Sequence, residues 1–133
     1  RDTVKALTDG RGADVIYDPV GGDVFDESMR CINWGGRILS IGFTSGRWPQ
    51  APVNLILIKQ IAVIGVRAGE YGRQDPVKGL ENAQRLYAMA EAGEIDPYIS
   101  HALPIEKAVE AMRLLEQREV VGKAVVTMNG YQM

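Results

Sequence analysis

The sequence predicts an α/β protein built on an open parallel sheet, which is half of a doubly wound fold. Three short apolar segments, residues 13–20, 37–43 and 61–66, have the β-branched content of strands. Helix-like segments separate them, and parallel neighbours need such crossovers. The near-continuous apolar run of the first segment further predicts a strand that is covered on both faces. One sheet of this kind fits a length of 133 residues.

The first part of the chain, residues 1–72, alternates helix and strand. Residues 2–9 form a short amphipathic helix that ends at the glycines after it. After the first strand, Asp23 caps a helix that we expect to run to Trp34. Its apolar residues recur at i, i+4 and i+7 and should face the sheet: Phe25, Met29 and Ile32.

The second strand leads through a loop to a short helix near residues 54–60, with Asn54 as its cap, and the strand over residues 61–66 completes the set. No Pro interrupts this third strand, and it would be the outermost of its half of the sheet. Such an edge leaves backbone groups unpaired. We therefore expect a homodimer in which Ile61 to Val66 pairs with its own copy across a two-fold axis.

Residues 73–128 have a different character. Asp75 caps a long helix with Pro76 at its first position, and its buried face should contain Leu80, Ala83, Tyr87 and Ala90. An extended piece follows, then a second amphipathic helix and a last strand over residues 123–128. The apolar stripe of that second helix should contain Ile105, Ala108, Val109, Met112 and Leu115. Residues 129–133 are expected to form a frayed tail.

The glycines of the chain do not form a dinucleotide fingerprint. That motif requires G-x-G-x-x-G between a strand and a helix, and the segment VGGDVF lacks the spacing. Glycines nevertheless recur where each of three strands ends, at Pro19 to Gly22, Gly42-Phe43 and Val66 to Gly69. Each set could serve only a tight turn. Together they favour a ligand-binding edge, because ligands of open parallel sheets bind at the carboxyl ends of the strands.

Five segments in a fixed order carry a resemblance to a known family. They are GADVIYDPVGG, GGRILSIGF, NLILIKQIAVIGVRAGE, LPIEKAVEAMRLLE and GKAVVTM. As an ordered set they resemble the carboxyl-terminal part of medium-chain dehydrogenase/reductases, in the zinc-free NADPH:quinone oxidoreductase branch. The resemblance implies the carboxyl-terminal half of a Rossmann-type sheet, followed by the helices and strand that return to the catalytic domain. The glycine fingerprint would then lie upstream of Arg1.

The resemblance also implies roles for residues at the strand ends. Those placed near the nicotinamide or its ribose are Val20, Gly21, Gly42 and Phe43. The carboxamide would meet backbone groups of Val66 and Ala68. Lys123 matches a position where some relatives direct a cation to the pyrophosphate, and a solvated lysine at a strand start explains it equally well. The implied cofactor is NADPH, with NADH left open.

The remaining polar residues do not form a catalytic constellation. Cys31 and His101 stand about seventy positions apart with no zinc-ligand spacing, so no metal site is expected. Asp14 and Asp18 would share a strand face, but an acid/base pair needs a partner element that the sequence does not reveal. Tyr71 fits a packed loop better than a substrate cleft. The catalytic residues therefore stay unidentified.

The implied reaction is hydride transfer from NADPH to a quinone or an activated alkene or carbonyl acceptor, with this chain by itself inactive. Two alternatives stay open: a methyltransferase-like domain that binds S-adenosylmethionine, and a non-catalytic dimerisation module. A net charge of −2 and the absence of basic runs argue against nucleic acid as a partner. No membrane-length apolar run is present, and the single cysteine fits a cytoplasmic protein.

Overall fold

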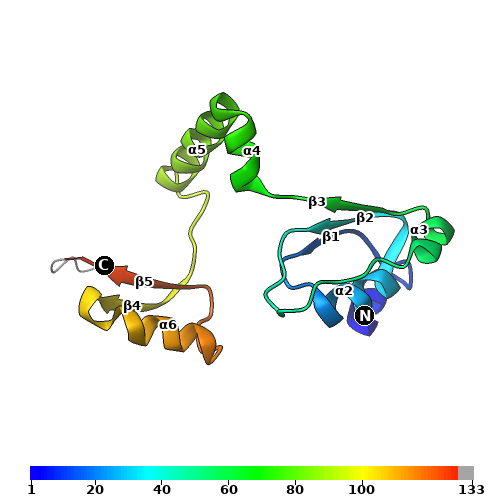
Figure 1. The fold of residues 1–133 in the computed structure, drawn as a ribbon, viewed down its shortest axis with the longest axis horizontal. Helices are drawn as coiled ribbons and strands as arrows, with labels where there is room; N and C mark the ends of the chain where they lie inside the picture. Colours follow the sequence, from blue (N-terminus) through cyan, green and yellow to red (C-terminus); the bar gives the residue numbers. More distant parts are fainter. Residues whose placement is uncertain (129–133) are drawn as a thin grey trace. The chain divides into compact units, whose positions relative to one another are not determined.

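The computed structural model describes residues 1–128, and these form two compact units that divide after Pro76 (Figure 1). Each unit has its own sheet, of three strands in the first and two in the second. The division leaves helix α4 (Ala68–Gln74) whole within the first unit. The expected tail, residues 129–133, lies outside the described residues.

The first unit contains the predicted parallel sheet. Strands β1 (Ala13–Asp18), β2 (Ile32–Ser40) and β3 (Ala62–Gly65) pair in that order, and both pairs are parallel. Helices α2 (Gly22–Cys31) and α3 (Val53–Lys59) are the crossovers between them. The prediction of an open parallel α/β sheet is therefore confirmed.

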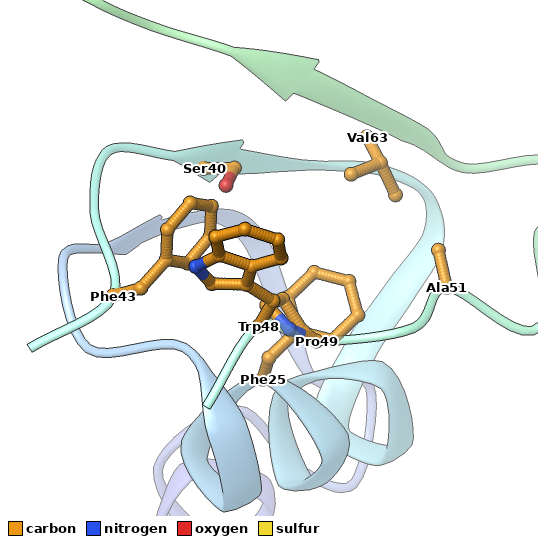
Figure 2. Close-up of a pocket in the computed structure, with 7 residues that line it drawn as sticks. All are labelled: Phe25, Ser40, Phe43, Trp48, Pro49, Ala51 and Val63. Carbon is orange, nitrogen blue, oxygen red and sulfur yellow. The ribbon is translucent and has the colours of Figure 1, made fainter. Parts of the chain in front are cut away.

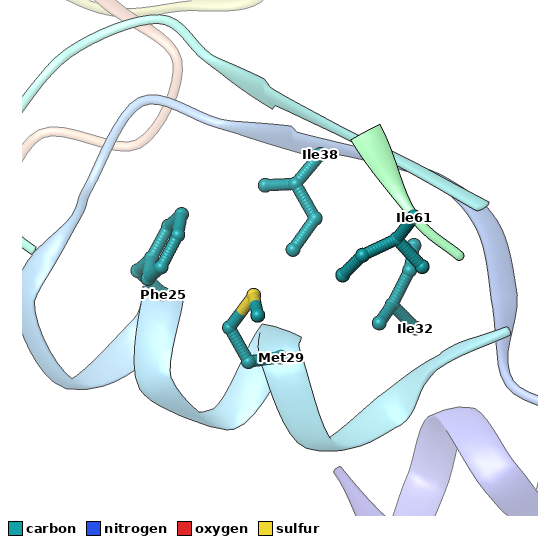
Figure 3. Close-up of a cluster of buried hydrophobic side chains, with 5 residues drawn as sticks. All are labelled: Phe25, Met29, Ile32, Ile38 and Ile61. Atoms are coloured by element: carbon teal, nitrogen blue, oxygen red, sulfur yellow. The ribbon is translucent and has the colours of Figure 1, made fainter. Parts of the chain in front are cut away.

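The core of this unit lies on one face of the sheet. Its buried members are two residues of α2, two of β2 and one that directly precedes β3, namely Phe25, Met29, Ile32, Ile38 and Ile61 (Figure 3). Leu55 and Ile56 of α3 pack against the same cluster. Both helices therefore cover the same face. This follows from a strand order that advances in one direction, because right-handed crossovers then fall on one side.

The other face of the sheet is exposed, so the prediction of cover on both faces is wrong for the described chain. Tyr17 is 66% exposed, although it lies on a strand of apolar character. It is in register with Leu39, which is in turn in register with the exposed Ile64. Helices reach the second face of a doubly wound sheet only where the strand order reverses. The order β1-β2-β3 contains no such reversal.

Helix α2 ends three residues earlier than the sequence predicts. Its last residue is Cys31, and Ile32 has an extended backbone with φ −65° and ψ 137°. Ile32 is buried as expected, but it begins β2 and pairs with Ala13. The apolar period therefore continues past the helix end, because the same core receives the first residue of the strand.

A lysine from α3 satisfies the carboxyl end of α2. The ammonium group of Lys59 donates to the carbonyl oxygens of Met29 at 2.7 Å and of Arg30 and Ile32 at 3.3 Å. These carbonyls have no helical partner, so the contact ties the two helices together. Partial desolvation lowers the pKa of Lys59, and the positive charge of Lys5 adds to this effect.

Two predicted helix caps are also corrected. Helix α2 begins at Gly22 with Gly21 as its N-cap, and Asp23 instead lies in the first turn. Helix α3 begins at Val53 after Pro52, and no side chain caps it. For α2 the turn at Gly21 determines where the helix begins, and α3 begins directly after the extended residue Pro52.

The second unit contains a parallel pair of strands, β4 (Ile99–Pro104) and β5 (Lys123–Thr127). A short 3₁₀ turn, η1 (Ile105–Lys107), leads into helix α6 (Ala108–Glu116), which contacts both strands. The buried residue of α6 is Ala111. The predicted stripe is only partly correct, because Ala108 is half-buried but Val109, Met112 and Leu115 are all more than half exposed.

Helix α5 (Pro76–Glu91) begins at Pro76 as predicted, but none of its residues is buried. Leu80 is 61% exposed and Tyr87 is 71% exposed, so the expected buried face is wrong for the described residues. The apolar residues do recur at helical spacing, and the helix itself forms. Burial also requires a partner surface, which the pattern alone cannot supply.

Candidate functional site

The carboxyl ends of the three parallel strands of the first unit lie along one edge of the sheet. The register pairs Asp18 with Ser40, and Ser40 with Gly65, so the strands end at the same level. We call the residues at and after these ends, 18–22, 40–43 and 65–69, the strand-end edge. Each of the three expected ligand-binding segments belongs to it.

A buried aspartate shapes the turn after β1. Asp18 is 2% exposed, and its Oδ1 accepts hydrogen bonds from the backbone N–H groups of Val20 and Gly21, each at 2.9 Å. This is an Asx-type turn, in which a side chain replaces a backbone acceptor. Asp14, by contrast, is exposed and accepts from the amide of Asn33 at 2.7 Å. The two aspartates therefore do not form a pair.

The loop after β2 is bound to the same turn by backbone hydrogen bonds. The carbonyl of Asp18 accepts from Ile41 at 2.9 Å, and the carbonyl of Val20 accepts from Ser45 at 3.0 Å. Between them, the carbonyl of Pro19 accepts from the N–H of Thr44 at 3.3 Å. Three consecutive carbonyls of the first turn thus hold the loop that follows the second strand.

The paired glycines of this turn are explained by their own chain. Gly21 and Gly22 have φ values of +67° and +54°, which residues with a side chain rarely adopt. A Cβ on Gly21 would lie 2.9 Å from the ring of Phe43, and one on Gly22 would lie 2.6 Å from the hydroxyl of Ser45. The absence of a side chain at both glycines therefore lets the loop after β2 pack closely against this turn. The expected cofactor contacts of Val20 and Gly21 stay predictions.

The end of β3 is more open. A Cβ built on Gly65 or Gly69 would have no neighbour within 4 Å. Val66 is 36% exposed, and its N–H donates to Ser40 at 2.9 Å. Ala68 is the first residue of α4, a helix that the sequence analysis missed, so Tyr71 lies in a helix and not in a loop. The described backbone here is accessible to a ligand.

A hydrophobic cavity of about 450 Å³ adjoins the strand-end edge (Figure 2). Its lining consists of three aromatic side chains with smaller apolar groups and one hydroxyl, from Phe25, Ser40, Phe43, Trp48, Pro49, Ala51 and Val63. Arg47 holds the loop at its rim through ion pairs to Asp23 at 2.8 Å and Asp26 at 2.6 Å. This cavity was not predicted from the sequence, although Trp48 in a loop was a signal for one.

The structure brings most of the predicted cofactor residues together. The strand-end edge contains Val20, Gly21, Gly42, Phe43, Val66 and Ala68. Lys123 belongs to the second unit, where it is exposed at the start of β5 and its N–H donates to Tyr98 at 2.9 Å. Its cofactor contact stays a prediction.

Cys31 and His101, for which no metal site is expected, belong to different units and have different surroundings. Cys31 is buried at the end of α2, and His101 of the second unit shares a 2.8 Å hydrogen bond with the hydroxyl of Ser100. Within residues 1–128, no three His, Cys, Asp or Glu side chains cluster in a way that could hold a metal ion. The same part of the chain has no helix with the length and apolar character needed to cross a bilayer.

Comparison with known proteins gives a consistent family. A model described as zinc-binding dehydrogenase matches residues 1–126. The chain is 39% identical over 127 residues to a quinone oxidoreductase-like protein 2 homolog from Nematostella vectensis. That match covers 95% of this chain and 35% of the relative, so the chain spans about a third of the relative's length.

Solved structures agree on the fold. The crystal structure of an NAD-dependent alcohol dehydrogenase matches with a TM-score of 0.79 and 29% identity, over 96% of this chain and 35% of that one. A mycobacterial protein solved with NADPH matches with a TM-score of 0.80 and 24% identity, over 94% and 39% of the two chains. The chain therefore belongs to the zinc-binding dehydrogenase family of the medium-chain dehydrogenase/reductases and is similar to its quinone oxidoreductase-like members.

Proposed function

We propose that this chain supplies the nicotinamide side of the cofactor site of an NADPH-dependent oxidoreductase. The proposed reaction reduces a quinone or an activated alkene or carbonyl acceptor. One observation carries the proposal: three parallel strands present their carboxyl ends at one edge, which is where open α/β sheets bind ligands. The names of the relatives and the NADPH complex of a protein with this fold support it.

The residues of the edge fit a bound nicotinamide half. Gly65 and Gly69 leave open space beside the backbone, and Phe43 offers a ring that is 43% exposed. When bound, NADPH would supply the hydride, and the acceptor would receive it. The chain would bind and orient the ring through Gly42, Phe43, Val66 and Ala68. The adjoining apolar cavity would help to exclude water.

The described residues do not supply a set of zinc ligands. The family description names zinc, but the buried thiol of Cys31 and the imidazole of His101 belong to different units and have different partners. The donor set in the described part of the chain therefore does not fit a zinc site. That the protein works without zinc stays a prediction.

The two alternatives have less support. The family match is to dehydrogenases, and the segment YDPV lacks the second proline and the aromatic residue of a methyltransferase loop. A purely structural role as a dimerisation module is favoured only by the exposed edge of β3. Binding of labelled S-adenosylmethionine would support the first alternative, and a dimer without nucleotide affinity would support the second.

The chain alone is expected to bind NADPH with millimolar or weaker affinity, roughly 4 kcal/mol or less, and to show no turnover. The reason is that its sequence has no glycine fingerprint to bind the pyrophosphate. Isothermal titration calorimetry measures the affinity, and loss of NADPH absorbance with a quinone measures turnover. A micromolar dissociation constant would show that the pyrophosphate site lies within this chain.

We also propose that the chain forms a homodimer through the edge of β3. The other proposed partner is the small-molecule acceptor. The strand is shorter than the predicted Ile61 to Val66, since β3 covers Ala62–Gly65. Ile61 lies just before it and is buried in the core. The N–H of Val66 points to β2, where it donates to Ser40. Because N–H groups alternate along a strand, those of Val63 and Gly65 point to the open edge.

Proline at the outward positions should therefore give monomers. Gly65→Pro and Val63→Pro each remove one outward donor while the bonds to β2 remain. Gly65 has no packed side chain to lose, so it is the cleaner site. Ala62→Pro is the matched control, since it removes a donor that faces β2 and should destabilise the sheet. Light scattering measures the mass, and dimers from both outward variants would place the interface elsewhere.

A further inference from the structure

The turn after β1 depends on one side chain that the proposed reaction does not use. Asp18 is the last residue of β1 and is almost fully buried. One carboxylate oxygen accepts from both Val20 and Gly21 at 2.9 Å. A carboxylate is an acceptor only, so it can take both N–H groups without burying a donor of its own. Hydrogen bonds to an ionised acceptor are also stronger than neutral ones.

The main chain of the same residue reaches the end of β2. Its carbonyl accepts from Ile41 at 2.9 Å and, more weakly, from Gly42 at 3.4 Å. The next carbonyls, of Pro19 and Val20, accept from the loop after β2. Any change in the backbone of the Asp18 turn therefore moves the acceptors to which the second strand end is bound.

We propose that Asp18 is a positioning residue for cofactor binding, which it serves by fixing the ends of β1 and β2 in one arrangement. It acts through Val20 and Gly21 and through the bound loop, and it needs no contact with the cofactor. This role rests on the proposed function, because Val20, Gly21, Gly42 and Phe43 are the residues assigned there to the nicotinamide side.

Amide hydrogen exchange tests the positioning without cofactor. In Asp18→Ala, exchange should become about tenfold faster or more at Val20 and Gly21, which lose their acceptor, and also at Ile41. The amide of Ile38, at the centre of the core, is the internal reference and should change less. Asp18→Asn keeps the Oδ1 acceptor and should recover much of the protection from exchange. If the alanine variant does not fold, the same measurement is made on Asp18→Asn. If amide exchange at Ile38 became faster by the same factor, Asp18 would only stabilise the fold in general, and the positioning role would be wrong.

NADPH-induced amide shifts test the link to the cofactor. At one subsaturating NADPH concentration, the shifts at Gly42 and Phe43 should be about tenfold smaller in Asp18→Ala than in the unmodified chain, and intermediate in Asp18→Asn. The matched control is Asp14→Ala, which removes an exposed carboxylate of the same strand and should leave the shifts unchanged.

The outcomes separate this role from the proposed function. Unmodified chain that shows no NADPH-dependent shifts at the edge, even at millimolar NADPH, would overturn the proposed function and this role with it. Shifts that are present in the unmodified chain and undiminished in folded Asp18 variants would overturn the positioning role alone. Faster exchange confined to Val20 and Gly21, with Ile41 still protected, would also overturn it, because the coupling between the two strand ends would be missing.

Discussion

Met29→Ala is expected to lower the free energy of unfolding of the first unit by about 2 to 5 kcal/mol. Met29 is 1% exposed and lies among Phe25, Ile32, Ile38 and Ile61 in the core of the first unit (Figure 3). Truncation removes apolar atoms from this cluster and leaves a cavity that the sheet and α3 can close only in part. Urea unfolding followed by circular dichroism measures the change.

Val24→Ala is the matched control for this truncation. Val24 belongs to the same helix but is 47% exposed, so its truncation should change stability by no more than about 0.5 kcal/mol. Equal effects of the two substitutions, or no effect of Met29→Ala, would mean that α2 does not pack on the sheet through the described face.

Gly12→Ala is expected to destabilise the first unit by roughly 2 to 5 kcal/mol, through a left-handed backbone and a steric clash together. Gly12 has a φ of +95°, which L-residues adopt at a cost. An added Cβ would also run into the carbonyl oxygen of Cys31 and would lie 3.0 Å from the nitrogen of Asn33. Both are backbone atoms where α2 gives way to β2, and they cannot move without disturbing the core.

Gly10→Ala separates the two causes. Gly10 has a similar φ of +81°, but an added Cβ would have no neighbour within 4 Å. It should therefore cost only the conformational part, about 1 to 2 kcal/mol. Thermal unfolding of both variants gives the comparison. Equal losses would contradict the close approach of the segment before β1 to the end of α2.

The sequence predicted the elements whose causes are local. The period of Phe25 and Met29 placed α2 on the sheet correctly, and Pro76 marked the start of α5. The same period could not show that Ile32 leaves the helix, because its pairing with Ala13 across nineteen residues decides that. Nor could it show that the apolar face of α5 stays exposed, because burial depends on a partner surface.

The candidate site was predictable to a similar extent. Glycines after three strands indicated the edge, and the parallel register brings them to one level. The cause of the paired glycines was not predictable, since Phe43 and Ser45 approach them from the loop after β2, which is distant in sequence. The role of Asp18 had a local signal, because Asp followed by Pro favours an Asx-type turn, although its spacing from Asp14 drew attention to acid/base chemistry instead.

We propose that this chain holds the nicotinamide half of NADPH at the strand-end edge. Two-dimensional ¹H–¹⁵N spectra of the chain test it most directly, with titration of reduced nicotinamide mononucleotide, 2′,5′-ADP and NADPH in turn. We expect NADPH and the reduced mononucleotide to shift the same amides, at Val20 to Gly21, Gly42 to Phe43 and Val66 to Ala68, while 2′,5′-ADP leaves them unchanged. Shifts produced by 2′,5′-ADP at this edge, or nicotinamide-induced shifts confined to other parts of the chain, would contradict it.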